Sequence, residues 1–324
     1  MTLLVIVLNY RVTGLAIECL RSLAREIPCI SGARAVMVEN GSGGDAAALL
    51  HDAIFSNGWA PWAELRVLPE NLGFTGGNNL VIREAMASDD PPQRVLLLNA
   101  DTVIHDGAIQ ALIESLDQHP RAGIAGSRLV YPDGRPQGTP FRFQGIASEF
   151  ERGAGIGLVS SLLRRWAVCP PKPAVAVPVD WVAGACMMIR REVIETLGTL
   201  DDDYFAYFED MDYCLNARRA GWETWYVPES WIVHHEGQSS GIEASPGGAR
   251  PAYWFQARRR YFLKNHGAAY AALADAAFLI GRAIGKLARR LAGKPDPAPR
   301  GFFKDSIRHS VFVSGFRLRR FERQ

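Results

Sequence analysis

The sequence predicts an α/β fold with a mostly parallel central sheet and helices on both of its faces. Four short apolar runs recur early in the chain, each is followed by residues at helical spacing, and each ends in polar or glycine residues. The runs are residues 3–8, 35–38, 65–68 and 95–98. Ligands of parallel sheets bind beyond the carboxyl ends of the strands, so we expect a site along that edge.

The first run is predicted to be a buried strand that ends at Asn9 and Tyr10. It is short and carries neither a basic leader nor a small-residue cleavage pattern, so we expect a strand and no signal peptide. The second run ends at Glu39 and continues into a glycine-rich turn. Both strands therefore deliver hydrogen-bonding side chains to the same edge of the sheet.

A second glycine-rich turn follows the third run. It contains Asn71, Gly73, Phe74, Gly76 and Asn78. Glycines here let backbone N–H groups approach a ligand at a helix N-terminus, where the helix dipole favours anions. The spacing matches neither the dinucleotide-binding motif nor the P-loop, so the turn alone is also compatible with a simple tight bend.

The fourth run ends in Asn99 and Asp101, whose oxygens are the ligands that Mg²⁺ or Mn²⁺ accept. A lone N-x-D is also a common turn that closes a strand, and by itself that is the simpler interpretation. The motifs further along the chain must decide between the two.

The second half of the chain is less regular. Residues 131–178 are rich in Gly, Pro and Arg, which is typical of a functional lid or binding loop, with disorder equally open. Residues 200–215 place six acidic residues among five aromatic ones. Rings suit the apolar faces of sugars and carboxylates bind their hydroxyls, although acids in a first helical turn also serve as dipole partners. His234 follows a predicted strand, as a surface residue or as a ligand of a divalent cation.

The charge of the chain is unevenly distributed. Of a formal net charge of +2, the residues from Arg282 onward carry +9, with twelve basic and three acidic residues. Residues 1–281 carry −7, with 24 basic and 31 acidic residues. A basic tail on an acidic body predicts attachment to an anionic partner or, equally, a solvated helix.

Five cysteines without a C-x-x-C pair favour a reducing compartment and argue against a zinc site.

The tail is predicted to be a basic amphipathic helix. Its apolar seam at helical spacing consists of Leu273, Ala277, Ile280, Ile284, Leu287 and Leu291. Arg282, Lys286 and Arg289 lie opposite, so the helix suits an anionic membrane surface, or packing on the body or on a second subunit. The longest apolar stretch, residues 268–281, contains Asp275 and is shorter than a membrane span, so we expect no transmembrane helix.

Seven motifs in order give the chain a family resemblance. They are residues 8–10, 39–42, 71–79, 98–102, 181–185 and 207–212, and an H-x-x-G-x-S motif at 234–239. Together they resemble the family 2 glycosyltransferases of the GT-A fold, in particular the rhamnosyltransferase-like branch, over residues 3–265. The resemblance implies a GT-A domain at 1–267, followed by a helical extension at 268–324. Within the domain, 1–130 would bind the nucleotide-sugar and 131–240 the acceptor.

The resemblance implies a role for each motif. Asp210 would be the general base of an inverting reaction, with Glu209 as the second candidate. Asp101, helped by His234, would hold Mg²⁺ or Mn²⁺ on the diphosphate of the donor. The acceptor would contact Trp181, Gly184 and Tyr207. The activated sugar nucleotide would contact Asn9, Tyr10, Glu39, Asn71, Gly73, Phe74, Gly76, Asn78 and Asn99.

Two positions depart from the family pattern. Glu39 stands where an aspartate is usual and is one methylene longer. Asn99 stands where the metal motif often has a carboxylate, which leaves Asp101 as its one acidic residue.

The resemblance also implies partners. The donor would be thymidine-diphospho-rhamnose or a uridine-diphospho-sugar, and the acceptor a hydroxyl of a glycan or of a lipid-linked sugar. We expect a cytoplasmic protein, peripheral at the inner face of the plasma membrane, with no nucleic-acid partner and with a homodimer through the C-terminal helices left open. Two alternatives are a nucleotidyltransferase, whose glycine-rich loop with Arg and Lys is not found at residues 9–14, and a non-catalytic binding module.

Overall fold

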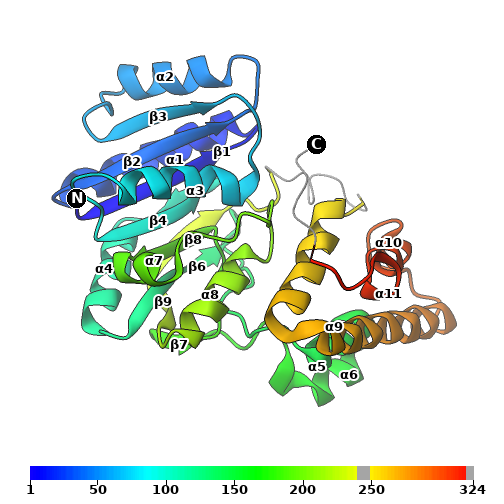
Figure 1. Cartoon of the computed structure of the whole chain (residues 1–324). Coiled ribbons are helices and arrows are strands. Elements are labelled where there is room, and N and C mark those ends of the chain that lie inside the picture. Colours follow the sequence, from blue (N-terminus) through cyan, green and yellow to red (C-terminus); the bar gives the residue numbers. More distant parts are fainter. Residues whose placement is uncertain (239–248, 319–324) are drawn as a thin grey trace.

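The computed structural model describes residues 1–238 and 249–318, and one central sheet organises it (Figure 1). The strand order is β3-β2-β1-β4-β8-β6-β9-β5, with β7 paired to β9. Strands β1 to β4 are parallel neighbours, whereas β8 runs antiparallel to β4 and begins a mixed half. The strands are β1 (Leu3–Asn9), β2 (Ala33–Asn40), β3 (Ala63–Leu68), β4 (Arg94–Asn99), β5 (Thr102–Ile104), β6 (Ala122–Val130), β7 (Val177–Val179), β8 (Cys186–Arg190) and β9 (Glu223–His234).

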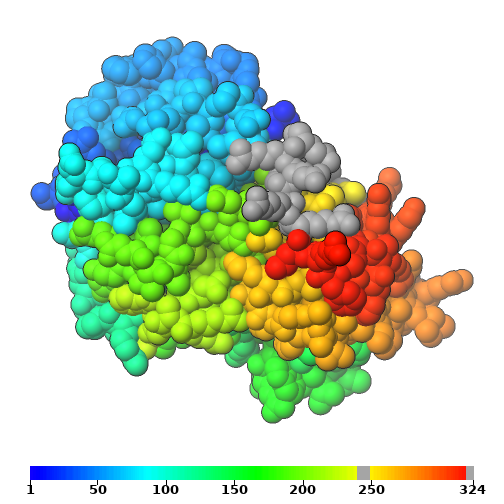
Figure 2. Space-filling view, viewed as in Figure 1, coloured from blue at the N-terminus to red at the C-terminus, as the bar shows by residue number. Residues whose placement is uncertain are grey.

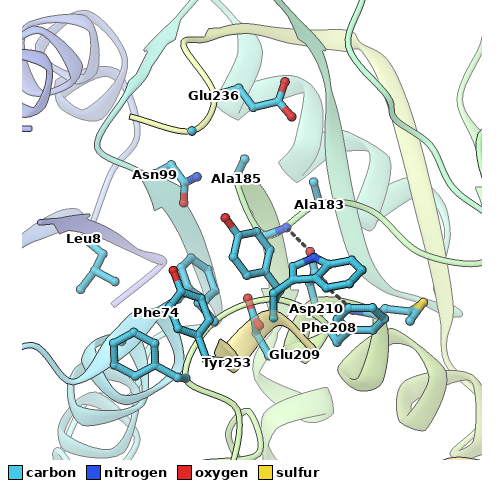
Figure 3. A pocket seen from close by; sticks show the side chains of 18 of the residues that line it. Leu8, Phe74, Asn99, Ala183, Ala185, Phe208, Glu209, Asp210, Glu236 and Tyr253 are labelled. Atoms are coloured by element: carbon cyan, nitrogen blue, oxygen red, sulfur yellow. Dashed lines mark hydrogen bonds between the residues drawn. The ribbon is translucent and has the colours of Figure 1, made fainter. Parts of the chain in front are cut away.

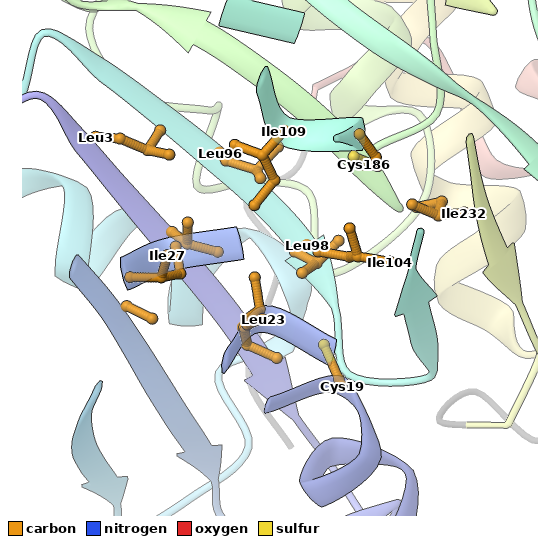
Figure 4. Packing of buried hydrophobic residues seen from close by; sticks show 14 of the residues in the cluster. Leu3, Cys19, Leu23, Ile27, Leu96, Leu98, Ile104, Ile109, Cys186 and Ile232 are labelled. Atoms are coloured by element: carbon orange, nitrogen blue, oxygen red, sulfur yellow. The ribbon is translucent and has the colours of Figure 1, made fainter. Parts of the chain in front are cut away.

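Helices cover both faces of the sheet, as predicted. Successive side chains of a strand point to opposite faces, so Leu3 and Val5 of β1 join one core while Leu4 and Ile6 join the other. Figure 4 shows the first core, where Leu3 and Leu96 of the sheet meet side chains of the covering helices. The first face carries α1 (Thr13–Glu26), α2 (Ala46–Ser56) and α4 (Ala108–Gln118), and the second α3 (Gly73–Met86), α7 (Arg191–Leu197) and α8 (Glu209–Arg219).

The insertion after β6 is partly helical. It forms α5 (Ile146–Ala154), α6 (Gly157–Leu162) and a 3-10 turn at Arg164–Trp166. The alternative of disorder is therefore wrong for this part of residues 131–178. Helix α5 was not predicted because it is only nine residues long and contains Gly153. In a segment rich in glycine, that residue looks like part of a loop.

Helix α5 lies against α9 (Ala252–Leu291), the long helix that leads into the C-terminal region (Figure 1). The backbones of the two helices touch. A Cβ atom on Gly281 would overlap the carbonyl oxygen of Phe150, and one on Gly285 would overlap that of Ala154. Glycine at both positions is what permits this close approach.

A buried ion cluster joins the same elements. Arg258 of α9 donates through Nε to Glu149 of α5 at 2.8 Å and also pairs with Asp275, further along α9. Asp275 accepts the backbone N–H of Val311 at 2.7 Å. The last helices, α10 (Phe302–Arg308) and α11 (Val311–Ser314), are thereby held against α9.

Helix α9 changes direction at Gly267, where φ is 82° and ψ is 175°. This kink lies at the predicted end of the GT-A domain, although the division of the chain into domains stays a prediction. Beyond it, the predicted amphipathic helix exists but presents the opposite face to the body. Arg282 is buried, and Gly281 packs on α5, whereas the apolar seam is exposed, for example 57% at Leu287. Packing of the seam on the body is therefore wrong, because the small residues opposite it allow the closer contact.

By length and composition α9 is the one helix among the described residues that could cross a membrane, and 33% of its apolar window is buried. Residues 268–281 alone suggested no such span. The helix as a whole nevertheless has a kink at Gly267 and contains the buried pair of Arg258 and Asp275, an arrangement that fits packing on protein. Our expectation of no transmembrane helix stays a prediction.

Candidate active site

A cavity of about 490 Å³ opens at the carboxyl edge of the sheet. Tyr10 lines it after β1 and Asp101 after β4, and Phe74 contributes from the first turn of α3. Asp210 reaches it from the start of α8 (Figure 3), and the lining also includes His234 at the end of β9. Asp101 and Asp210, 109 positions apart in the chain, thus line one cavity.

Strand pairing brings His234 to Asp101. Strands β5 and β9 are antiparallel with Thr102 opposite His234, and the backbone N–H of His235 donates to the carbonyl of Asp101 at 2.9 Å. The imidazole Nε2 then lies 3.4 Å from Asp101 Oδ1 and 3.3 Å from Asn99 Nδ2. The three predicted residues at this edge are therefore brought together.

The chemistry of this group fits a divalent cation. Gln137 Oε1 lies 2.9 Å from His234 Nδ1, which favours the tautomer with a proton on Nδ1 and a lone pair on Nε2, where Asn99 Nδ2 can donate. Asp101 Oδ1 is buried and has no hydrogen-bond partner among the described residues. This carboxylate oxygen is therefore unsatisfied, and the lone pair of His234 Nε2 lies beside it. No group of three or more His, Cys, Asp or Glu side chains that could hold a metal is found in the described part of the chain, so most ligands would come from phosphate and water.

The predicted nucleotide residues divide into two groups. Tyr10, Asn71, Gly73, Phe74 and Asn99 line the cavity. The residues outside the lining are Asn9, Glu39, Gly76 and Asn78.

The residues outside the lining have local partners. Asn9 Oδ1 accepts the N–H of Val12 before α1, and Asn78 donates to the carbonyl of Phe74 at 2.8 Å. The carboxylate of Glu39 accepts the N–H groups of Gly41 and Ser42, the latter at 2.7 Å. These bonds shape the turns of the edge, and direct contact of these residues with a nucleotide stays a prediction.

Asn40 is a lining residue that sequence reasoning missed. Its Nδ2 donates to Asn71 Oδ1 at 3.0 Å and to the carbonyl of Gly73 at 3.1 Å, while its Oδ1 accepts the N–H of Leu72. It therefore fixes one turn of the edge against the next. Its place at the end of β2, beside Glu39, was the available signal.

Asp210 is presented by a strained turn. Tyr207 and Phe208 both adopt left-handed backbone conformations, with φ of 71° and 69°, just before α8 begins. Asp210 Oδ2 then accepts the N–H of Gly184 at 3.0 Å, and Oδ1 accepts the N–H of Met211 at 2.8 Å. Both hydrogen bonds favour the charged form of the carboxyl group.

Burial of Asp210 has the opposite effect and favours the neutral form of its carboxyl group. Desolvation raises the pKa of Asp210 above its ordinary value, although the N–H groups of Gly184 and Met211 counteract it. The pKa of Glu209 is raised further, well above the ordinary value, by desolvation and by the neighbouring charge of Asp210. Glu209 Oε2 is buried without a partner in the described structure. Burial and the neighbouring charge thus favour the neutral form of Glu209, whereas the two N–H groups favour the charged form of Asp210.

Aromatic side chains form the opposite wall. Trp181 stacks on Phe141 with ring centroids 4.1 Å apart, and its indole N–H donates to the carbonyl of Arg142 at 2.9 Å. Tyr207 stacks on Tyr253 at 6.1 Å. The predicted acceptor residues Trp181, Gly184 and Tyr207 all line the cavity. Residues missed on this wall are Phe141, Gln144, Arg152, Arg250, Tyr253 and Trp254.

The family model described as "Glycosyltransferase like family 2" matches residues 2–260. The chain belongs to this family. The recognition from seven motifs is thus confirmed. One of those motifs, at 234–239, ends at Ser239, which lies outside the described residues.

Relatives in sequence are rhamnosyltransferases and other hexosyltransferases. An N-acetylglucosaminyl-diphospho-decaprenol L-rhamnosyltransferase of Mycobacterium tuberculosis is 29% identical over 193 residues, covering 56% of this chain and 62% of its own. The low-salt glycan biosynthesis hexosyltransferase Agl10 of Haloferax volcanii is 32% identical over 156 residues, or 46% and 44% of the two chains. The rhamnosyltransferase WbbL of Escherichia coli is 33% identical over 85 residues, covering 25% of this chain and 32% of its own. The aligned part thus spans less than two thirds of each relative.

Solved structures confirm the predicted GT-A fold. A mannosyltransferase from Pyrobaculum calidifontis, in complex with GDP-mannose and Mn²⁺, is similar with a TM-score of 0.55 and 15% identity, over 97% of this chain and 84% of that chain. The GalNAc-T7 structure with UDP, GalNAc and Mn²⁺ has a TM-score of 0.62 and 15% identity, over 98% and 58%. At this identity the likeness concerns the fold of the family 2 domain.

Proposed function

We propose that this family 2 protein is an inverting, metal-dependent glycosyltransferase that moves a sugar from a nucleoside-diphosphate donor to a hydroxyl group of a glycan or lipid-linked acceptor in cell-surface polysaccharide synthesis. The observation that carries this proposal is that Asp101 and Asp210 line one cavity, each with an environment suited to a different task. Asp101 leaves a buried oxygen unsatisfied, whereas Asp210 is a carboxylate held by two N–H groups.

Asp101 and His234 are the residues that would hold Mg²⁺ or Mn²⁺ beside Asn99. When bound, the cation neutralises negative charge on the leaving diphosphate. The protein's own contribution at this edge is orientation. Gln137 fixes the ring of His234 from behind. The N–H groups of Gly73 and Phe74 at the start of α3 donate to Asn71 and Phe205, so they hold the turn in place.

Asp210 is the general base. Its carboxylate takes the proton of the acceptor hydroxyl as that oxygen attacks the anomeric carbon, the bond to the nucleoside diphosphate breaks on the opposite face, and the configuration inverts. Burial raises the pKa of Asp210 toward the working pH, which improves a base as long as the group stays ionised. Glu209 favours that state, because it holds the proton of the pair.

The rhamnose-like donor is supported by the mycobacterial and E. coli relatives, whose names specify rhamnosyl transfer. A uridine-diphospho-sugar is the next choice. Thermal stabilisation by a panel of nucleotide sugars, with and without Mn²⁺, identifies the donor, since a ligand that binds only the folded form raises the melting temperature. Stabilisation by no nucleotide sugar would contradict the proposal.

The variant Asp210→Asn tests the base. We expect sugar transfer, measured as nucleoside diphosphate release with acceptor present, to fall about 10²- to 10⁴-fold, while stabilisation by the donor persists. Asp203→Asn is the matched control, because Asp203 lies in the same acidic loop, pairs with Arg260 and does not line the cavity. Unchanged release by Asp210→Asn would remove Asp210 from the mechanism.

The two alternative functions have different products. A nucleotidyltransferase would release pyrophosphate from a sugar 1-phosphate and a nucleoside triphosphate, and a binding module would be stabilised by donor without releasing nucleoside diphosphate. Either result with the wild-type protein would replace the proposed activity.

We further propose that the exposed seam of α9 docks on an anionic lipid surface at the cytoplasmic face of the membrane. The C-terminal region that contains the seam is coloured orange to red in Figure 2. The large apolar side chains exposed on α9 beyond Gly267, on α6 and on α11 are Leu158, Leu162, Leu273, Ile280, Ile284, Leu287, Leu291, Phe312 and Val313. Lys286 and Arg290 are exposed on α9 among them. Apolar side chains with interspersed cations match an interface of acyl chains and anionic head groups.

Vesicle sedimentation tests this surface. Replacing Ile284 and Leu287 by serine should weaken binding to anionic vesicles, whereas Phe55→Ser on α2, which is 62% exposed, should not. A fall in oligomer mass with unchanged vesicle binding would show instead that the seam joins two subunits.

All five cysteines are free, which agrees with the proposed cytoplasmic location.

A further inference from the structure

Two arginines line the aromatic side of the cavity, and no step proposed above uses them. They are Arg152 of α5 and Arg250, which precedes α9. A series of contacts leads from Asp210 to Arg152. Asp210 accepts the backbone N–H of Gly184, which lies three residues after Trp181, and Trp181 stacks on Phe141.

Arg152 is at the other end of the series. Gln144, three residues after Phe141, accepts a hydrogen bond from its guanidinium.

Arg152 is held from behind. Its Nη1 donates to Gln144 Oε1 and to Glu149 Oε1, each at 2.7 Å. The side chain of Glu149 is completely buried and is itself anchored by Arg258. The Nε and Nη2 atoms of Arg152 have no partner among the described residues, and 28% of the side chain is exposed. Two N–H-bearing nitrogens of a fixed guanidinium are therefore available on this wall.

Arg250 is the second arginine on this side of the cavity. Its guanidinium lies 5.3 Å from the ring centroid of Trp254, another lining residue, and it forms no ion pair within the described part of the chain. Arg152 and Arg258 pair with Glu149 and Asp275, whereas Arg250 has no acidic partner among the described residues. An anionic group on the acceptor would give Arg250 such a partner.

We propose that Arg152 and Arg250 form a subsite for a phosphoryl group on the acceptor. The planar guanidinium fork matches pairs of phosphate oxygens, which is why arginine is preferred for such groups. The acceptor sugar would lie against the aromatic wall with its hydroxyl at Asp210 and its phosphoryl group toward Arg152. This inference rests on the proposed function and narrows its acceptor to a phosphate-linked sugar. The donor diphosphate is the other source of the same chemistry.

Two acceptors that carry the same sugar separate these sources. In one the sugar is joined to an alkyl chain through a diphosphate, and in the other through a neutral glycosidic oxygen. The wild-type protein should use the diphosphate acceptor with the higher kcat/KM. In Arg152→Gln, kcat/KM for the diphosphate acceptor should fall about 10- to 100-fold, as expected for lost hydrogen bonds to a charged group. The loss for the neutral acceptor should be at least about tenfold smaller. Arg152→Lys should restore part of the difference.

Arg164→Gln is the control, because Arg164 is exposed in the same insertion and does not line the cavity. Equal losses on both acceptors in Arg152→Gln would mean that Arg152 only supports α5, which overturns the subsite. A raised KM for the donor would assign the arginine to the donor diphosphate, and also overturns it. Absence of any transfer by the wild-type protein would refute the proposed function itself, whereas equal use of both acceptors would refute the subsite alone.

Discussion

The sheet edge and the α5–α9 pair form two walls of one cavity, but they are built by different kinds of contact. At the edge, consecutive strands deliver Tyr10, Asn99 and Asp101 from their own carboxyl ends, so local sequence sets their position. Across the cavity, Arg152 depends on Glu149 and Arg258, which lie 109 residues apart in the chain. The first wall follows from the order of strands, and the second from long-range packing.

This difference indicates which lining residues can vary between relatives. A parallel edge that binds a diphosphate is constrained by strand geometry and by the helix that follows each strand. The α5–α9 pair can change its lining residues while keeping the close contact at Gly281 and Gly285. We therefore expect this wall to determine which acceptor is used.

Asp101→Asn should damage the edge without damaging the fold. The side chain keeps its size but loses the charge that would hold the cation, so we expect transfer to fall about 10²- to 10³-fold. Stabilisation by Mn²⁺ with nucleotide sugar, measured as the shift in melting temperature, should be lost as well. Asp106→Asn is the control, because Asp106 is exposed and pairs with Arg25 at the surface. Full activity of Asp101→Asn would mean that the reaction needs no cation at this position.

Arg258→Met should lower the free energy of unfolding by weakening the contact between α5 and α9. It leaves Glu149 with Arg152 alone and Asp275 with only the N–H of Val311, and breaking a buried pair typically costs about 3–5 kcal/mol of unfolding free energy. Arg25→Met, which removes an exposed pair with Asp106, should cost at most about 1 kcal/mol. Urea denaturation measures both. Similar small losses would show that α5 and α9 are not joined by this cluster.

Gly281→Ala tests the helix contact by adding one methyl group. The new Cβ meets the carbonyl oxygen of Phe150, and relieving that overlap should cost about 1–3 kcal/mol. Gly157→Ala in α6 is the matched change, since nothing lies near its added Cβ, and alanine favours a helix by about 1 kcal/mol over glycine. The two variants should therefore shift the melting temperature in opposite directions. A stabilised Gly281→Ala would mean that the helices are further apart.

The first wall could be predicted from sequence for a physical reason, and the second could not. Asn99 and Asp101 follow an unbroken apolar strand, so the local pattern identified them as candidate metal ligands. Asp210 follows an acidic and aromatic loop, but its role came from the family resemblance. The partnership of His234 with Gln137 required the pairing of β9 with β5 and β6, which no local pattern encodes.

The contact between α5 and α9 could not be read from the sequence. The sequence analysis gave no role to Gly281 and Gly285, whereas in the structure they allow contact between the two helix backbones. Arg282 was placed on the basic face opposite the apolar seam. The small residues beside it bring that face onto α5, where Arg282 is buried and pairs with Asp296.

Glu209→Gln gives the smallest effect and tests the proton of the carboxyl pair. Burial raises the pKa of Glu209 well above its ordinary value near 4.5, so above that value the folded protein binds more protons than the unfolded chain. Unfolding free energy of the wild type should therefore fall as pH rises from about 4.5 toward the raised pKa. The amide does not titrate, so the variant should gain stability relative to the wild type across this pH window. Below the window, the difference in unfolding free energy between the two proteins should be constant.

Urea denaturation over a pH series measures this difference, with Glu192→Gln at the exposed start of α7 as the control. A difference that does not change with pH would mean that Glu209 is ionised in the folded protein, which would make it as good a candidate for the base as Asp210.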